Sequence, residues 1–227
     1  MRTLVVFLLL ATVAATGASA ASDHQAENSP PASAKATEVP CEGATSPVPG
    51  IDARGDIDSD GHDEVAAVTY CGAGDDMEIV VSKRDSDGVK RVIAATGTWG
   101  RDNLRRDQIS LQRGSLTYST NCNGSCGEQS WSEDFTFRFE RKALVLVSIE
   151  QSWMNSDGSA YGTRINLLKG YAIHFRKKGS REVERRTTFK PATLSFNAFS
   201  LDTMHDVIDS TLGMHGYVDE HFHFREQ

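Results

Sequence analysis

The sequence predicts an all-β protein of antiparallel β-sheets, arranged as a sandwich or in a propeller-like way, with one short C-terminal helix. Apolar and polar residues alternate with a period of two from Glu64 to Phe189, as in strands with one buried face. Turn signals such as Asp87-Gly88 and Asp157-Gly158 separate these runs. About ten strands at a spacing of roughly 8–12 residues, without helical patterns between them, favour antiparallel pairing.

The N-terminus has the features of a secretory signal peptide, predicted at residues 1–20. Arg2 precedes an apolar run, and the small residues Ala18-Ser19-Ala20 follow it. The mature chain is expected to begin at Ala21, in the periplasm or outside the cell. No stretch reaches the roughly 20 consecutive apolar residues that a membrane helix needs, so we expect no membrane span.

Five of the six prolines lie in residues 21–50, where no apolar periodicity occurs. Such a segment buries too little surface to offset the entropy of ordering it, so we expect a disordered tether. Residues 51–227 are then expected to form a single β domain. The whole chain carries a formal charge of −7, and loss of Arg2 with the signal peptide makes it −8. An acidic surface disfavours nucleic acid as a partner.

The four cysteines predict two disulfides, because an exported chain folds in an oxidising compartment. Cys122 and Cys126 flank a three-residue loop, and we pair them. This leaves Cys41 with Cys71, although four cysteines allow three connectivities. A four-cysteine zinc site is the alternative, with a spacing that is loose for such sites.

The most specific motif is the acidic segment Asp56 to Glu64, which an apolar run from Val65 to Val68 follows directly. Ca²⁺ takes six to eight oxygen ligands, and a tight loop supplies them from alternate residues when a glycine such as Gly61 permits the turn. An EF-hand would need a bidentate glutamate where Ala67 stands. The predicted ligands are the side chains of Asp56, Asp58, Asp60 and Glu64 and the backbone carbonyl of His62.

The apolar run after the acidic segment reads as a strand, so the motif resembles the loop-then-strand calcium site of integrin-type FG-GAP repeats. The alternative is an acidic turn without metal. It is less favourable, because the four carboxylates predicted as ligands repel one another when no cation neutralises them.

The later strands are expected to form a series of hairpins. The predicted strand runs are Met77 to Ser82, Val89 to Ala95, Gln108 to Gln112, Ser115 to Ser119, Phe135 to Phe139, Leu144 to Ile149, Tyr161 to Leu168 and Tyr171 to Phe175. In the fifth run phenylalanine occupies every second position, which indicates one buried face. The sixth run is apolar at both parities, so we expect a central strand covered on both sides.

A polar loop from Thr120 to Trp131 holds the predicted Cys122–Cys126 pair and ends in an aromatic anchor. A loop closed at its base has less entropy to lose on binding, so we predict a target-binding surface. Its candidate contact residues are Ser125, Glu128 and Trp131. The alternative is a surface loop without a binding role.

Three features near the C-terminus are expected to have structural rather than ligand-binding roles. The basic segment Arg176 to Lys190 is expected to be a solvated hairpin rather than a ligand-binding edge. Asp202 is the expected N-cap of the short helix, which ends at Gly213. His221 and His223 would share one face of a terminal strand, but no third metal ligand is fixed by spacing, so we expect no zinc or copper site.

Several of these elements together resemble exported bacterial calcium-loop proteins of the FG-GAP-like or VCBS type that are related to periplasmic inhibitors of invertebrate-type lysozyme. The resemblance is carried by the acidic loop, Phe135-Thr136-Phe137-Arg138-Phe139, Leu144-Val145-Leu146-Val147 and Asn166-Leu167-Leu168-Lys169-Gly170. It implies an inhibitor or immunity protein whose partner is a lysozyme or another peptidoglycan hydrolase. Lys169 replaces the threonine usual in that family.

Other functional classes remain as alternatives. The motifs G-x-S-x-G, H-E-x-x-H and the P-loop are absent from the sequence, so we expect no enzymatic activity. A calcium-stabilised adhesion or carbohydrate-binding module fits the composition as well as an inhibitor does.

Overall fold

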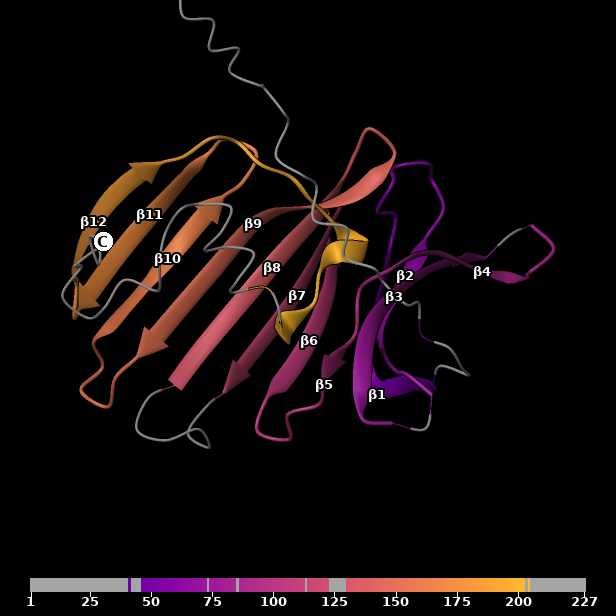
Figure 1. The fold of residues 1–227 in the computed structure, drawn as a ribbon, viewed down its shortest axis with the longest axis horizontal. Helices are drawn as coiled ribbons and strands as arrows, with labels where there is room; N and C mark the ends of the chain where they lie inside the picture. The colour runs from indigo at the N-terminus through magenta and orange to yellow at the C-terminus, as the bar shows by residue number, and fades with distance from the viewer. Residues whose placement is uncertain are drawn as a thin grey trace, which may run out of the picture. The chain divides into compact units, whose positions relative to one another are not determined.

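The computed structural model describes Cys41, residues 46–72, 74–84, 86–112, 114–122 and 130–202, and Met204. In this part of the chain, thirteen strands form two antiparallel sheets (Figure 1). A short 3-10 turn lies at Phe196–Ala198, and Leu201, Asp202 and Met204 are α-helical. The all-β, antiparallel prediction is therefore confirmed. The propeller-like arrangement is not found in the described residues, because two sheets replace the four or more blades that a propeller needs.

The small sheet has the strand order β1-β2-β3-β4, and β5 also pairs with β3. Its strands are β1 (Ser46–Gly55), β2 (Glu64–Tyr70), β3 (Asp76–Arg84), β4 (Lys90–Ala95) and β5 (Trp99–Gly100). Consecutive strands are neighbours, as the predicted hairpin from Met77 to Ala95 requires. The acidic loop connects β1 to β2, so the loop-then-strand arrangement expected from the sequence is present.

The large sheet is a meander with the order β12-β11-β10-β9-β8-β7-β6, and β13 pairs with β9 (Figure 1). Its strands are β6 (Arg106–Gln112), β7 (Ser115–Cys122), β8 (Ser130–Glu140), β9 (Ala143–Met154), β10 (Ala160–Asn166), β11 (Tyr171–Lys178), β12 (Arg181–Thr188) and β13 (Leu194–Ser195). Almost every residue of β12 is exposed, which confirms a solvated basic hairpin.

One hydrophobic core joins the two sheets. The Trp99 ring at the small sheet lies 5.6 Å from the Tyr118 ring of β7, measured between centroids. Phe199 follows the 3-10 turn and packs edge-on against Phe135 and Phe137, with centroids 4.9 and 5.1 Å apart. The alternating phenylalanines of β8 therefore face the core, as predicted.

The strand β9 is central in the large sheet, as its sequence predicted. Apolar residues occupy both its odd and its even positions, in part because the strand contains a β-bulge. Thr136 pairs with Ser148 and Phe137 with Leu146, so Val147 is the extra residue. An extra residue shifts the alternation by one position, and Leu146 and Ile149 both join the core.

The boundary predicted between tether and domain is wrong for residues 46–50. The strand β1 begins at Ser46, and Pro47 stands opposite Thr69 of β2. Proline is tolerated here because β1 is an edge strand, and a register shift separates Pro47 from Asp52. The rest of the predicted tether up to residue 40, and the signal peptide, lie outside the described residues.

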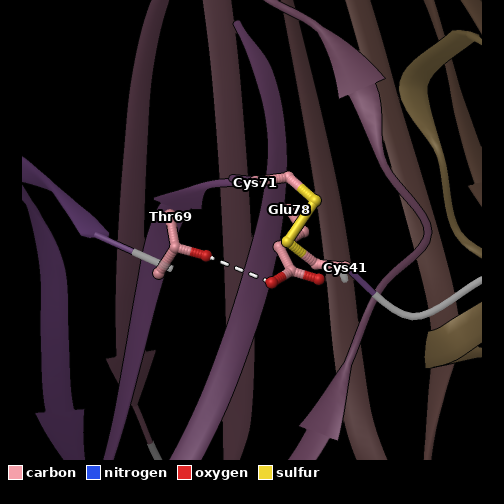
Figure 2. Close-up of a disulfide and its surroundings, with 4 residues drawn as sticks. All are labelled: Cys41, Thr69, Cys71 and Glu78. Atoms are coloured by element: carbon pink, nitrogen blue, oxygen red, sulfur yellow. Dashed lines mark hydrogen bonds between the residues drawn. A yellow bond between two sulfur atoms is a disulfide. The ribbon is translucent and has the colours of Figure 1, made fainter. Parts of the chain in front are cut away.

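The predicted Cys41–Cys71 disulfide is present, so the zinc alternative for the four cysteines is wrong (Figure 2). Figure 2 shows Glu78 of β3 beside it, where Thr69 Oγ1 donates a hydrogen bond to Glu78 Oε1 at 3.4 Å. Burial raises the pKa of Glu78. Cys122 is also disulfide-bonded, while its predicted partner Cys126 lies outside the described residues.

A disulfide of this kind is typical of oxidising, extracytoplasmic compartments. No helix in the described part of the chain has the length and apolar character needed to cross a membrane. Most of the predicted C-terminal helix, and the histidines His221 and His223, lie outside the described residues. Asp202 was the expected N-cap, but helical structure already begins at Leu201, so Asp202 lies inside it. Its Oδ2 accepts a hydrogen bond from the backbone N–H of Gly100 at 3.1 Å.

Candidate metal centre and target-binding surface

The acidic loop is closed by hydrogen bonds from its own backbone to its own carboxylates. Asp56 Oδ1 accepts from the N–H of Asp60 at 3.1 Å, and Asp56 Oδ2 accepts from the N–H of Gly61 at 2.9 Å. Ser59 and Gly61 adopt left-handed conformations with φ of 61° and 87°. Short acidic side chains are favoured here because they bond the turning backbone while keeping lone pairs for a cation.

Glu64 anchors the loop to the core, because its side chain is 0% exposed although it begins β2. Its Oε2 accepts a hydrogen bond from the N–H of Ile57 at 2.8 Å. Ile57 is the apolar residue within the loop and is itself buried, 2% exposed. Glu64 Oε1 makes no hydrogen bond of ordinary geometry, although it is buried. A carboxylate oxygen in this state needs a cation beside it to offset its desolvation.

Three of the predicted ligands converge. Carboxylate oxygens of Asp56, Asp58 and Glu64 lie within 4.8 Å of one another. Calcium–oxygen distances are about 2.3–2.6 Å, so ligands on opposite sides of one ion stand up to about 5 Å apart. The oxygen donors and their spacing are therefore compatible with a hard divalent cation of this kind.

The two remaining predicted ligands are not part of this group of converging carboxylates. Asp60 Oδ1 accepts a hydrogen bond from the N–H of His62 at 3.0 Å, and its Oδ2 contacts the ammonium group of Lys83. His62 is exposed, and its described role is this backbone hydrogen bond. The sequence pattern placed all five residues in one loop but did not distinguish the three that converge.

Lys83 is the residue that sequence reasoning missed. Its Nζ lies 3.3 Å from Glu64 Oε1 and 3.7 Å from Asp58 Oδ2, in addition to the contact with Asp60. The hydrogen bond to Asp60 is the main cause that raises the pKa of Lys83, and the same bond lowers the pKa of Asp60. The sequence alone did not place Lys83 beside the acidic loop. Its position follows from strand register, because Glu64 and Lys83 stand opposite each other on β2 and β3.

The acidic loop therefore already has an internal cation. Any divalent ion at the three converging carboxylates would lie close to the Lys83 ammonium, and the two positive charges would repel each other. A cation that binds at this centre would therefore compete with a tethered one.

The second candidate site is the end of the large sheet next to the disulfide-bonded Cys122. Trp131 stands opposite Cys122 on one side and Trp153 on the other, and Trp153 stands opposite Tyr161. The rings of Trp153 and Tyr161 are stacked, with centroids 5.5 Å apart and an angle of 11° between their planes. We call Trp131, Trp153 and Tyr161 the ring row.

A cationic group borders the ring row. The Arg105 guanidinium lies over the Trp131 ring, 5.7 Å from its centroid. Of the predicted target-binding residues, Trp131 belongs to this surface, whereas Ser125 and Glu128 lie outside the described residues. The sequence signalled Trp131 but not its neighbours from β9 and β10.

A row of buried polar side chains crosses the large sheet one step inward from the ring row. Gln151 Nε2 donates to Glu133 Oε1 at 3.0 Å. The ring of His174 is 0% exposed and bonds Thr163 Oγ1 through Nδ1 at 3.0 Å and Thr187 Oγ1 through Nε2 at 3.1 Å. Burial lowers the pKa of His174 to about 4, with a smaller contribution from the charge of Arg185. His174 is therefore neutral at physiological pH.

A comparison of the chain with protein-family models, with curated proteins and with solved structures finds no significant match.

Proposed function

We propose that this protein is an exported, calcium-binding inhibitor of lysozyme-like peptidoglycan hydrolases, acting as an immunity protein in the periplasm. The observation that carries the proposal is the ring row with Arg105 beside it. Tryptophan, tyrosine and arginine contribute most of the binding energy in protein interfaces, especially when clustered. The class of target rests on the resemblance of the chain to periplasmic lysozyme inhibitors.

In this proposal calcium has a structural role. Asp56, Asp58 and Glu64 would hold the ion, which neutralises their mutual repulsion and ties the acidic loop to the start of β2. The ring row lies on the other sheet, so calcium stabilises the fold rather than contacting the target.

A second candidate function is a calcium-stabilised adhesion or carbohydrate-binding module. The outer face of the large sheet favours it, because a pocket of about 300 Å³ lies there among short polar side chains such as Thr117, Thr136 and Asn166. Tyr171 also lines this pocket, and Arg186 lies over its ring at 4.2 Å from the centroid. Small-ligand sites commonly combine an aromatic surface with a few polar groups.

The test is residual lytic activity of c-type, g-type and i-type lysozymes and of bacterial peptidoglycan hydrolases after mixing with the purified mature protein. Inhibition of at least one enzyme is expected. Trp131→Ala and Trp153→Ala should each weaken it by about tenfold or more, as hot-spot residues do. Tyr171→Ala is the matched control, because it removes a ring that also lies under an arginine but on the opposite face of the sheet.

Melting temperatures of the three variants separate lost contacts from lost folding. No inhibition of any enzyme by the wild type would reject the inhibitor proposal. Binding to insoluble polysaccharide that Tyr171→Ala abolishes and Trp153→Ala leaves intact would instead support the second candidate.

A further inference from the structure

A basic pocket lies on the outer face of the small sheet, apart from the ring row. Its volume is about 480 Å³, and Val65 of β2 and Ser82 of β3 line it. Their sequence neighbours Ala66 and Val81 belong to the core, so alternation along the strands places the pocket on the opposite face. Three cationic side chains also line it: Arg54 from β1, Arg84 from β3 and Lys90 from β4.

Strand register brings these cations together although they are distant in sequence. Arg54 stands opposite Val65, and Val65 stands opposite Ser82. Arg84 follows Ser82 by two positions, so it shares the same face, and it stands opposite Lys90. The same sheet face therefore carries the neighbouring cations Arg84 and Lys90 and, on the far side of β2, Arg54.

Among the described residues, no carboxylate lies within ion-pair distance of these three cations. In the described part of the chain, the side chains of Arg54, Arg84 and Lys90 make no ion pair and no hydrogen bond. By contrast, Arg164 on the large sheet contacts the carboxylates of Glu150, Glu182 and Glu184. Converging cations that lack partners repel one another, and a protein with a net charge of −7 gains nothing in solubility from such a cluster.

The charge of the pocket indicates the charge of its ligand. Asp63 also lines it, so three cations and one carboxylate leave a net charge of +2. Lys83 lines the pocket as well, but its ammonium is held by the carboxylates of the acidic loop. The planar fork of arginine matches the oxygens of phosphate through paired hydrogen bonds.

We propose that this pocket binds a dianionic oxyanion with the chemistry of a phosphate group, either free phosphate or a small phosphate monoester. The volume of about 480 Å³ is larger than a phosphate ion needs, so it leaves room for the organic part of a small monoester. The pocket shares no residue with the ring row, so this site adds to the proposed function and does not depend on it.

The test is isothermal titration calorimetry of the mature protein with sodium phosphate and, separately, with glycerol phosphate. EDTA in the buffer keeps calcium from precipitating the phosphate and from occupying the acidic loop. Saturable binding is expected in at least one of the two titrations. The ligand with the lower dissociation constant shows whether free phosphate or a monoester is preferred. The variant Arg84→Gln with Lys90→Gln should weaken binding at least tenfold.

The matched control is Lys177→Gln with Arg181→Gln, which also removes two exposed positive charges but from the hairpin of β11 and β12. This control should bind phosphate within about twofold of the wild type, since the long-range effect of two surface charges is largely screened. Equal losses in the two double variants would mean a general charge effect and would overturn the proposal, as would absence of saturable binding. The single change Arg54→Gln repeats the test if the double variant has a lowered melting temperature.

Discussion

Lys83 and Glu64 stand directly opposite each other on β3 and β2, and the Lys83 ammonium lies 3.3 Å from the buried Oε1 of Glu64. A tethered cation therefore lies next to the three carboxylates that would hold calcium. This pairing makes the metal centre testable from two directions, through the metal and through the lysine.

Adding calcium should raise the melting temperature of the protein, and EDTA should lower it. Extracellular calcium sites bind at about 10⁻⁴–10⁻³ M, so millimolar calcium stabilises the fold by about 1 kcal/mol, or several degrees. Asp58→Ala together with Asp60→Ala should remove this response and leave a folded protein. Magnesium should substitute poorly, because it requires near-octahedral geometry. A melting curve indifferent to calcium and EDTA would reject the site.

Lys83→Met should destabilise the calcium-free protein, because Glu64 Oε1 then stays buried without a cation. Calcium should restore stability to this variant more than to the wild type. Its calcium dissociation constant should be roughly tenfold lower, since no tethered charge competes with the ion. Calorimetric titration with calcium measures this. Arg84→Met, a neighbouring cation without ion pairs, is the control and should leave calcium affinity nearly unchanged.

His174 should make the protein lose stability in mild acid. Its pKa falls from 6.5 in the unfolded chain to about 4 in the folded protein, because the ring is buried. The unfolded state therefore binds the proton first, and the stability contributed by neutral His174 is complete above pH 6.5 and is lost as the pH falls towards 4.

The matched variant is His174→Gln, which keeps hydrogen-bonding groups beside Thr163 and Thr187 but does not titrate. Between pH 7 and pH 4 the wild type should lose roughly 2–3 kcal/mol more unfolding free energy than this variant. Urea unfolding at each pH measures the difference. A difference that stays constant with pH would show that His174 already titrates normally in the folded protein.

Removing the Cys41–Cys71 disulfide by the double change to serine should lower the unfolding free energy by about 3–4 kcal/mol in the chain-entropy model. The bond spans a sequence separation of 30, and it ties Cys41 to the end of β2. Chemical unfolding of the wild type and of the variant, each with and without reductant, measures the effect. Reductant should lower the unfolding free energy of the wild type by breaking this bond, which the variant lacks. A loss below about 1 kcal/mol would mean that the unfolded chain is already compact around this loop.

Gly162→Ala should destabilise the large sheet, because a Cβ at this position overlaps the carbonyl oxygen of Gln151 and approaches Phe175 Cζ to 2.7 Å. Backbone cannot move aside as a flexible side chain can, so we expect a loss of about 3 kcal/mol, at the upper end of overpacking effects. The control is Gly100→Ala, where no atom lies within 4 Å. Thermal unfolding of both variants tests the contrast, and equal stabilities would contradict the packing of Phe175 against Gly162.

The sequence by itself determined most of the strands, their hairpin order and the acidic loop. Each of these depends on a local signal: the period of two in Phe135 to Phe139, the turn at Asp157-Gly158, or oxygen side chains at alternate positions. The Cys41–Cys71 pairing was reached only as the remainder once Cys122 had been paired with Cys126.

Two local assignments were wrong. Residues 46–50 were assigned to the tether, because prolines were read as breakers where an edge strand tolerates them. The predicted loop from Thr120 to Trp131 was too long, because β7 continues to Cys122 and β8 already begins at Ser130.

Only the tertiary structure decided which side chains meet across strands. Strand register brings Lys83 to the acidic loop and places Arg54 and Lys90 at the lining of one pocket. Register together with the bulge at Val147 places Trp153 opposite Trp131, and Tyr161 stands opposite Trp153. A slip of one residue in register would move each of these side chains to the other face of its sheet. Register depends on packing between strands far apart in sequence, and no pattern within a single strand contains that information.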